Sequence, residues 1–306
     1  MSKTHTLESD KLTVTIDDKG AELISIYDKS KGRELIWQAD PAYWKRHAPI
    51  LFPNVGKTYP GTFRFGGKTY PTKQHGFARD MEFTYVTGDD QKAVHLLTFN
   101  EETLKEYPFM FGLEVTHQVQ DNQVLVQWVI KNLGQEPMYC TIGGHPAFNV
   151  PDPSWNASSP EAPKNCFENY YLTFEKNKDS LHYLLLDPET GTARSKKKYE
   201  LPLEKGRCRI GKDRFQKDAL IFDDGQIQKA GIAHPDGSPY LTLVCSGFPN
   251  FGIWQSPGAP FLCLEPWWGR CDNFGFEGNL EEKPGIIKIY PWKTFEAFYT
   301  ITIADE

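Results

Sequence analysis

Polar and apolar residues alternate along much of this chain. The segments 11–17 (KLTVTID) and 123–131 (QVLVQWVIK) change character at nearly every position. The segments 240–246 (YLTLVCS) and 298–304 (FYTITIA) are rich in the β-branched and aromatic residues that favour strands. A period of two predicts strands with one buried face, and turn residues such as Pro235-Asp236-Gly237 fall between these runs.

Other local signals predict one hairpin and one short helix. The segment 61–71 (GTFRFGGKTYP) is typical of a hairpin with its two glycines at the turn. The segment 100–108 (NEETLKEYP) begins with Asn100 as a helix cap and ends with a proline. Helices do not alternate with strands, which argues against a parallel sheet. We therefore expect an all-β fold, a large antiparallel β-sandwich with few short helices.

The least regular stretch covers residues 149–169 (NVPDPSWNASSPEAPKNCFEN) and contains four prolines. It is either a domain linker or a long loop. The strand patterns on its two sides are alike, and no shift in composition follows it, so we interpret it as a loop over one face. We predict a single domain over residues 1–306.

Charge and composition restrict the partners. The chain has 34 Lys and Arg against 40 Asp and Glu, and this net charge of −6 lacks the basic surface that nucleic acids or anionic membranes require. We expect no membrane span, because no run approaches about 20 apolar residues. The six cysteines form no Cys-x-x-Cys pair, so we interpret them as reduced thiols and expect a cytoplasmic protein.

Several common catalytic motifs are missing. Gly-Lys-Thr occurs at 56–58 and at 67–69, but Leu51 and Thr62 stand where a phosphate-binding loop needs a glycine. The sequence also has no Gly-x-Ser-x-Gly, no His-Glu-x-x-His and no dinucleotide fingerprint. These absences argue against nucleoside triphosphatases, serine hydrolases, zinc proteases and nicotinamide oxidoreductases.

Three short motifs remain as candidates for chemistry: 74–80 (QHGFARD), 143–149 (GGHPAFN) and 263–272 (CLEPWWGRCD). In the second, the glycines before His145 and the proline after it can hold an imidazole at a strand end. In the third, Glu265 follows the apolar run PFLCL. Desolvation of a carboxylate there raises its pKa and makes it a better base at neutral pH.

Each motif alone has an ordinary explanation, since a lone histidine is usually a surface or hydrogen-bonded core residue. Together, His75, His145 and Glu265 supply an acid, a base and an orienting group. They are separated by 70 and 120 residues, so only the tertiary fold can bring them together.

In this order, the three motifs resemble those of the aldose 1-epimerase (mutarotase) family. The segment 46–57 (RHAPILFPNVGK) is similar to the LacX-like branch, with the hexose-6-phosphate 1-epimerases as cousins. The resemblance extends over about residues 8 to 303. It implies a galactose mutarotase-like β-supersandwich and an isomerase that interconverts sugar anomers without a cofactor or a metal. It is also consistent with a small sugar as the partner, and we expect a monomer or a homodimer.

The resemblance also implies roles for three residues. Glu265 matches the base, His145 the general acid, and His75 the histidine that hydrogen-bonds the sugar and supports charge on its ring oxygen. The chemistry is consistent with these roles, because ring opening needs a base and an acid on two oxygens of one carbon. Each positioned proton transfer is worth about 10²- to 10⁴-fold in rate.

The sequence departs from galactose mutarotases at two places. Those enzymes carry an Asn-Arg pair before the first histidine, where this chain has Gly56 and Lys57. We take Lys57 and the nearby Asn54 as substrate-binding candidates. In place of the family's Asp-His-x-Phe stretch, this chain has FQKDALIF (215–222), so Asp218 is the nearest match. The resemblance therefore does not single out galactose as the preferred substrate.

Arg79 has two interpretations. Its guanidinium either forms an ion pair with Asp80 or another acid, or points at sugar hydroxyls or a phosphate, which its planar fork suits.

The leading hypothesis is an epimerase of a free hexose. The alternatives are a hexose-6-phosphate 1-epimerase, which needs an arginine clamp, and a non-catalytic carbohydrate-binding protein. A glycoside hydrolase usually needs two carboxylates about 5–9.5 Å apart, and the motifs offer one.

Overall fold

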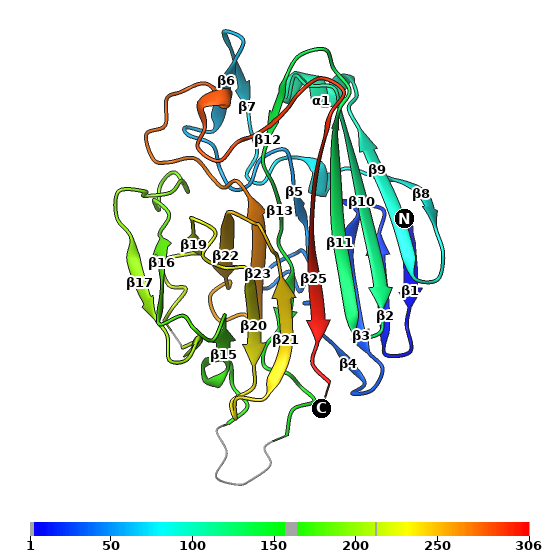
Figure 1. The fold of residues 1–306 in the computed structure, drawn as a ribbon, viewed down its shortest axis with the longest axis vertical. Helices are drawn as coiled ribbons and strands as arrows, with labels where there is room; N and C mark the ends of the chain where they lie inside the picture. The colour runs from blue at the N-terminus through cyan, green and yellow to red at the C-terminus, as the bar shows by residue number, and fades with distance from the viewer. Residues whose placement is uncertain (1–2, 157–163, 212, 306) are drawn as a thin grey trace.

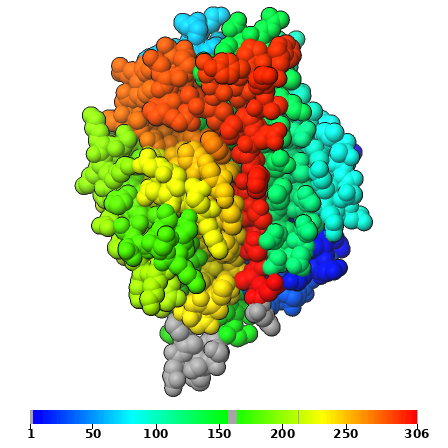
Figure 2. Space-filling model, in the orientation of Figure 1, coloured from blue at the N-terminus to red at the C-terminus, as the bar shows by residue number. Residues whose placement is uncertain are grey.

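Antiparallel strands make up nearly all the regular structure of the computed structural model, which describes residues 3–156, 164–211 and 213–305 (Figure 1). The largest sheet has nine strands in the order β18-β15-β20-β21-β25-β11-β10-β9-β8. Their bounds are β8 (Thr84–Gly88), β9 (Lys92–Thr98), β10 (Phe111–Gln120), β11 (Gln123–Asn132), β15 (Tyr171–Thr173), β18 (Arg207–Arg209), β20 (Lys229–Ala233), β21 (Pro239–Val244) and β25 (Thr294–Ile303). Figure 2 shows β25 as a central stripe between its neighbours in this sheet.

A second large sheet has the strand order β17-β16-β19-β22-β23-β13-β5, and β14 also pairs with β23. Its strands are β5 (Ile50–Leu51), β13 (Ile142–Gly144), β14 (Ala147–Asn149), β16 (Ser180–Leu184), β17 (Tyr199–Pro202), β19 (Leu220–Phe222), β22 (Asn250–Trp254) and β23 (Phe261–Trp268). The order does not follow the chain, since β13 lies between β23 and β5. This arrangement brings three distant segments side by side.

The remaining strands form smaller sheets. Four N-terminal strands pair in sequence order, and two further pairs are β6-β7 and β12-β24. Their bounds are β1 (Thr4–Glu8), β2 (Leu12–Asp17), β3 (Glu22–Asp28), β4 (Arg33–Glu34), β6 (Thr62–Phe65), β7 (Lys68–Pro71), β12 (Met138–Cys140) and β24 (Ile287–Ile289). The short helices are α1 (Glu101–Glu106) and the 3₁₀ turns η1 (Ala78–Asp80), η2 (Phe167–Asn169) and η3 (Leu280–Glu282). Within the described ranges, no helix has the length and apolar character needed to cross a bilayer.

The predicted all-β antiparallel fold is confirmed, and the alternating pattern explains it. In β11, Val124, Val126, Trp128 and Ile130 are buried, and the residues between them are partly or fully exposed. The same alternation runs through β2. The strands predicted over residues 240–246 and 298–304 are β21 and the second half of β25. One apolar cluster, with members from Leu7 to Ile303, fills the space that these buried faces enclose.

The predicted hairpin and helix are also confirmed. Strands β6 and β7 pair directly, and their turn consists of Gly66 and Gly67, which both have positive φ angles. Helix α1 begins after Asn100, whose side chain accepts hydrogen bonds from the backbone N–H groups of Glu102 and Thr103. These bonds satisfy two of the N–H groups that the first turn of a helix leaves free.

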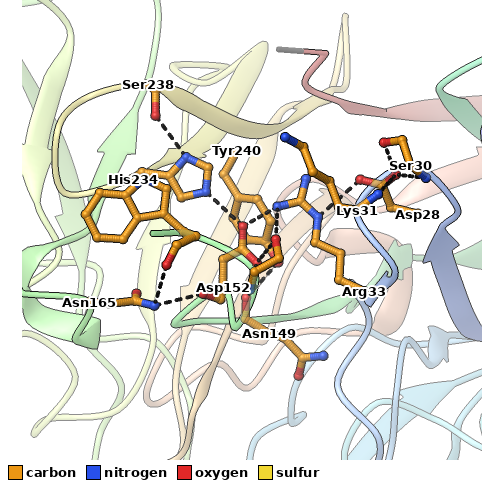
Figure 3. Close-up of polar contacts among 12 residues, drawn as sticks. Asp28, Ser30, Lys31, Arg33, Asn149, Asp152, Asn165, His234, Ser238 and Tyr240 are labelled. Atoms are coloured by element: carbon orange, nitrogen blue, oxygen red, sulfur yellow. Dashed lines mark hydrogen bonds and ion pairs between the residues drawn. The ribbon is translucent and has the colours of Figure 1, made fainter. Parts of the chain in front are cut away.

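The described part of the predicted long loop, which follows β14, is fixed by a buried charged network (Figure 3). Asp152 is completely buried, accepts a hydrogen bond of 2.9 Å from Nε2 of His234, and forms an ion pair with Arg33. Arg33 also pairs with Asp28 at 3.1 Å. The network therefore joins the loop to the four-stranded sheet and to the end of β20. Burial alone would raise the pKa of Asp152, but the hydrogen bond from His234 and the charge of Arg33 hold it below its usual range.

We expect Asp152→Asn to lower the free energy of unfolding by about 2 kcal/mol, because a neutral amide replaces the buried carboxylate that accepts from both Arg33 and His234. Urea denaturation measures this difference. The matched control is Asp224→Asn, which breaks the exposed pair with Lys198 at 2.7 Å and should cost about 1 kcal/mol or less. Equal effects of the two substitutions would contradict a stabilising role for the buried network.

Candidate active site

A cleft of about 400 Å³ collects side chains from all three sequence motifs. His75 and Arg79 come from the first motif, His145 from the second, and Glu265 and Trp267 from the third. The strand order explains this meeting: Gly143 of β13 pairs with Trp267 of β23 on one side and with Leu51 of β5 on the other. The first motif is attached to the end of β5 by a backbone bridge between Phe52 and Gly76. The tertiary fold thus brings the predicted catalytic residues together.

Glu265 lies within β23 opposite Gly252 of β22, and its side chain is almost fully buried. Burial raises the pKa of Glu265 well above its usual range, and the nearby Asp218 carboxylate adds to the rise. The sequence predicted the direction of this shift from the apolar run before Glu265. A carboxylate tuned upward in this way can exchange protons near neutral pH.

The glycines beside His145 serve a different purpose from the one expected. A Cβ atom on Gly143 would lie 2.4 Å from the indole of Trp267, and one on Gly252 would meet the same ring at 2.4 Å. Gly144 faces the ring of Tyr299 in the same way, at 3.0 Å. The missing side chains therefore make room for the rings of Trp267 and Tyr299 rather than for the imidazole. Trp267 lines the cleft, while Trp268 packs against Phe248.

His145 lies in the connection from β13 to β14 and faces Glu265. Its Nε2 atom is 3.2 Å from Oε2 of Glu265. The imidazole stacks on Trp44, with 4.8 Å between the ring centres, and meets Trp254 edge-on at 5.7 Å. Burial lowers the pKa of His145 to about 3, and the charges of nearby arginines add to the effect. The acid and base candidates are therefore immediate neighbours in a desolvated site.

His75 is held in a fixed orientation by the loop before β6. Its backbone has a φ of +66°, which is unusual for a residue other than glycine. The backbone N–H of Gly56 donates to Nδ1 of His75 at 3.1 Å, so the neutral ring carries its proton on Nε2. Burial, followed by the charges of His145 and Arg79, lowers the pKa of His75 well below its usual value. This neutral imidazole offers an N–H donor beside His145, whose ring it meets edge-on at 5.5 Å.

Two arginines line the same cleft. Arg46 pairs with Asp80 at 2.7 Å, and Arg79 donates to the carbonyl oxygen of Gln74 at 2.6 Å. The ion pair with Asp80 that we considered for Arg79 is thus formed by Arg46. Burial and the charge of Arg46 lower the pKa of Arg79 to about 10. Two cations this close favour an acceptor-rich or anionic ligand group at this end of the cleft.

The other predicted substrate-binding residues divide into two groups. Asp218 lines the cleft, with a positive φ of 74°. Asn54 and Lys57 are not among the described residues that line it. The amide of Asn54 donates to the carbonyl oxygens of Gly56 and Lys73, at 2.9 and 3.1 Å, and so holds the loop that orients His75.

The sequence did not indicate the aromatic wall of the cleft. Trp44 and Trp254 both line it; Trp44 stacks on the His145 ring, Trp254 meets that ring edge-on, and the two indoles also contact each other. Trp44 stands two positions before the segment 46–57 that carries part of the family resemblance, and this proximity was the only available signal. The position of Trp254 follows from the pairing of β22 with β23.

One set of donor atoms in the cleft resembles a metal site. The ligand atoms of His145, Cys263 and Glu265 lie within 4.8 Å of one another. Burial, with the Glu265 carboxyl adding to it, raises the pKa of the Cys263 thiol well above its usual value. Metals bind the thiolate form, which this raised pKa disfavours.

Comparison with known proteins gives a consistent assignment. Residues 3–266 match the family model described as aldose 1-epimerase. The plasmid and chromosomal LacX proteins of Lactococcus lactis subsp. lactis are each 31% identical over 307 residues, covering 98% of this chain and 99% of theirs.

Solved structures agree with the sequence comparison. A galactose mutarotase related enzyme from Lactobacillus acidophilus is 30% identical, with a TM-score of 0.89 over 99% of this chain and 98% of that chain. A galactose mutarotase-like protein from Lactobacillus casei is also 30% identical, with a TM-score of 0.87 over 99% of this chain and 100% of that chain. The galactose mutarotase-like fold and the resemblance to LacX are thereby confirmed.

Proposed function

The chain belongs to the aldose 1-epimerase family, and from that premise we propose that it interconverts the α and β anomers of a free hexose by acid–base ring opening. The observation that carries the proposal is the buried pair of Glu265 and His145, whose oxygen and nitrogen lie 3.2 Å apart. Opening an acetal ring removes a proton from the anomeric hydroxyl and adds one to the ring oxygen. Both oxygens are bound to one carbon, so the acid and the base must also be neighbours.

The proton balance of the pair suits this reaction. Burial raises the pKa of Glu265 and lowers that of His145, and both shifts favour a single proton held on the carboxyl. Its transfer from the carboxyl to the imidazole gives the carboxylate and the imidazolium. The carboxylate then accepts the anomeric proton while the imidazolium protonates the ring oxygen. After rotation about C1–C2, the same steps in reverse close the ring and restore the pair.

The surrounding residues supply binding. The Nε2–H of His75 is a neutral donor for the ring oxygen, and its orientation is set by Gly56. Trp44 and Trp254 offer flat apolar surfaces of the kind that suit the C–H face of a sugar. The cleft of about 400 Å³ is in the size range of small-molecule sites.

A second candidate substrate is a hexose 6-phosphate, because Arg46 and Arg79 both line the cleft. The test is anomer exchange measured by NMR on glucose, galactose and glucose 6-phosphate at one ionic strength. We expect exchange with a free sugar. A preference for the phosphate above about 100-fold in kcat/KM would favour the second candidate. Binding without exchange of any of the three would contradict both and indicate a carbohydrate-binding protein.

The value of kcat/KM should not fall when the pH is lowered from neutrality to about 5. A second proton joins the pair only near the lowered pKa of His145, about 3, so acid should not inactivate the free enzyme in this range. Activity should fall at alkaline pH, where the pair loses its single proton. Stopped-flow polarimetry provides the profile. A fall of kcat/KM on the acid side with a midpoint near pH 6.5, the ordinary pKa of a histidine side chain, would show that His145 titrates as a solvated group.

A further inference from the structure

A second cluster of potential ligands lies outside the cleft, where the four-stranded sheet meets the nine-stranded sheet. His5 is on β1, Asp18 directly follows β2, and His95 is on β9. Nε2 of His5 is 2.8 Å, and Nε2 of His95 is 3.2 Å, from the same Oδ1 atom of Asp18. All three ligand atoms lie within 4.8 Å of one another. None of these residues is among those that line the cleft.

We propose that His5, Asp18 and His95 form a binding site for a late first-row divalent cation such as Zn²⁺, which connects the N-terminal sheet to the nine-stranded sheet. Two imidazole nitrogens and a carboxylate oxygen are ligands that Zn²⁺ prefers, whereas Mg²⁺ and Ca²⁺ prefer oxygen. A tetrahedral Zn²⁺ with bonds of about 2.0–2.1 Å places its ligand atoms about 3.4 Å apart. The contacts of 2.8 and 3.2 Å are within about 0.6 Å of this spacing, and the two imidazole nitrogens lie within 4.8 Å of each other.

The local charge and packing favour a cation. Asp18 contributes one negative charge, and the negative charge of the neighbouring Asp17 is also felt at His95. The His95 side chain is fully buried, and its ring packs against that of Tyr85 with 5.6 Å between the ring centres. Tyr85 stacks on His5 with ring centres 3.9 Å apart and nearly parallel planes, so the exposed ligand is already oriented. The His5 side chain remains 23% exposed and gives the ion access from solvent.

Such a site would act on stability rather than on the chemistry of the cleft. β1 and β9 belong to different sheets, so an ion bound to both links two parts of the fold. A ligand that binds only the folded state stabilises it in proportion to the logarithm of its concentration. At a hundredfold excess over Kd, we expect the melting temperature to rise by about 4 °C.

The experiment is calorimetric titration and thermal unfolding of tag-free protein that has been treated with a chelator and then given Zn²⁺ or Mg²⁺. We expect one equivalent of Zn²⁺ to bind and raise the melting temperature, with no effect of Mg²⁺. His5→Gln should weaken Zn²⁺ binding at least about tenfold, because an amide is a poor ligand for zinc. This amide can still donate to Asp18, which preserves the fold. The matched control is His182→Gln, an exposed histidine on β16, which should bind as the wild type does.

A third variant distinguishes Zn²⁺ binding at this cluster from Zn²⁺ binding in the cleft. If the bound Zn²⁺ instead uses His145, Cys263 and Glu265, then Cys263→Ala will lose it and His5→Gln will keep it, which overturns the proposal. The proposal is also overturned if about a tenfold excess of Zn²⁺ over protein produces neither heat nor a change in melting temperature. The cluster is then a hydrogen-bonded connection only. Neither result depends on the proposed epimerase activity, because both measurements follow binding.

Discussion

The Glu265→Gln variant should lose at least about 100-fold of its turnover while it keeps its fold. Glutamine has the same shape as glutamic acid, but it cannot accept the anomeric proton. The carboxyl is almost fully buried in β23, and its pKa is raised by burial, so the uncharged amide should be tolerated there. We expect the melting temperature to stay about the same, because the amide has the shape of the carboxyl, whose raised pKa already favours an uncharged form.

Anomer exchange by NMR and thermal unfolding measure these two quantities on the same samples. The matched control is Glu175→Gln, which changes a partly buried carboxylate that does not line the cleft among the described residues. This control should keep normal turnover. If Glu265→Gln retained more than about a tenth of wild-type turnover, the assignment of Glu265 as the base would fail.

The second large effect is expected from His145→Asn, which should reduce kcat at least about 100-fold and change KM much less. The imidazole donates its proton to the ring oxygen as the ring opens, so its contribution is made in the transition state. His75→Asn provides the comparison within the cleft: its N–H binds the sugar in both states, so kcat and KM should both change. The two histidines therefore differ in which kinetic constant they control.

Steady-state kinetics by polarimetry separate the two constants. His182→Asn on β16 is the control for the substitution itself, because that histidine is exposed and distant in sequence from every motif. A His145→Asn variant with normal kcat and a raised KM would limit His145 to substrate binding. If His75→Asn changed neither kcat nor KM, the segment 74–80 would have only a structural role, as a loop.

The sequence by itself predicted the all-β class of the fold and a set of its elements, namely β2, β11, β21, the second half of β25, the β6-β7 hairpin and helix α1. Side chains in a strand alternate between two faces, so the run 123–131 already identified the buried residues of β11. The cap at Asn100 and the two glycines of the β6-β7 turn are likewise local features, and both are found in the structure. These features depend on residues a few positions apart, and for this reason sequence alone determines them.

The catalytic candidates were also identified from sequence, and the apolar run before Glu265 predicted the direction of its pKa shift. The proximity of Glu265 to His145 was not predictable without the family resemblance. It depends on β13 lying between β23 and β5, and sheet order is set by long-range packing. The same packing places Trp44 and Trp254 against His145, and it directs the Asn54 amide to the loop that orients His75 rather than to the cleft.

Only the tertiary structure shows which nitrogen of a histidine carries its proton and which potential ligand atoms come together. The tautomer of His75 follows from the N–H of Gly56, 19 residues away in sequence. The cluster of His5, Asp18 and His95 joins strands of two sheets, and nothing in the spacing of these residues predicts it. A sequence pattern predicts which face of a strand is buried, because burial repeats every two residues. It does not predict which other strand covers that face, because contacts between distant segments form only when the whole chain packs its apolar faces together.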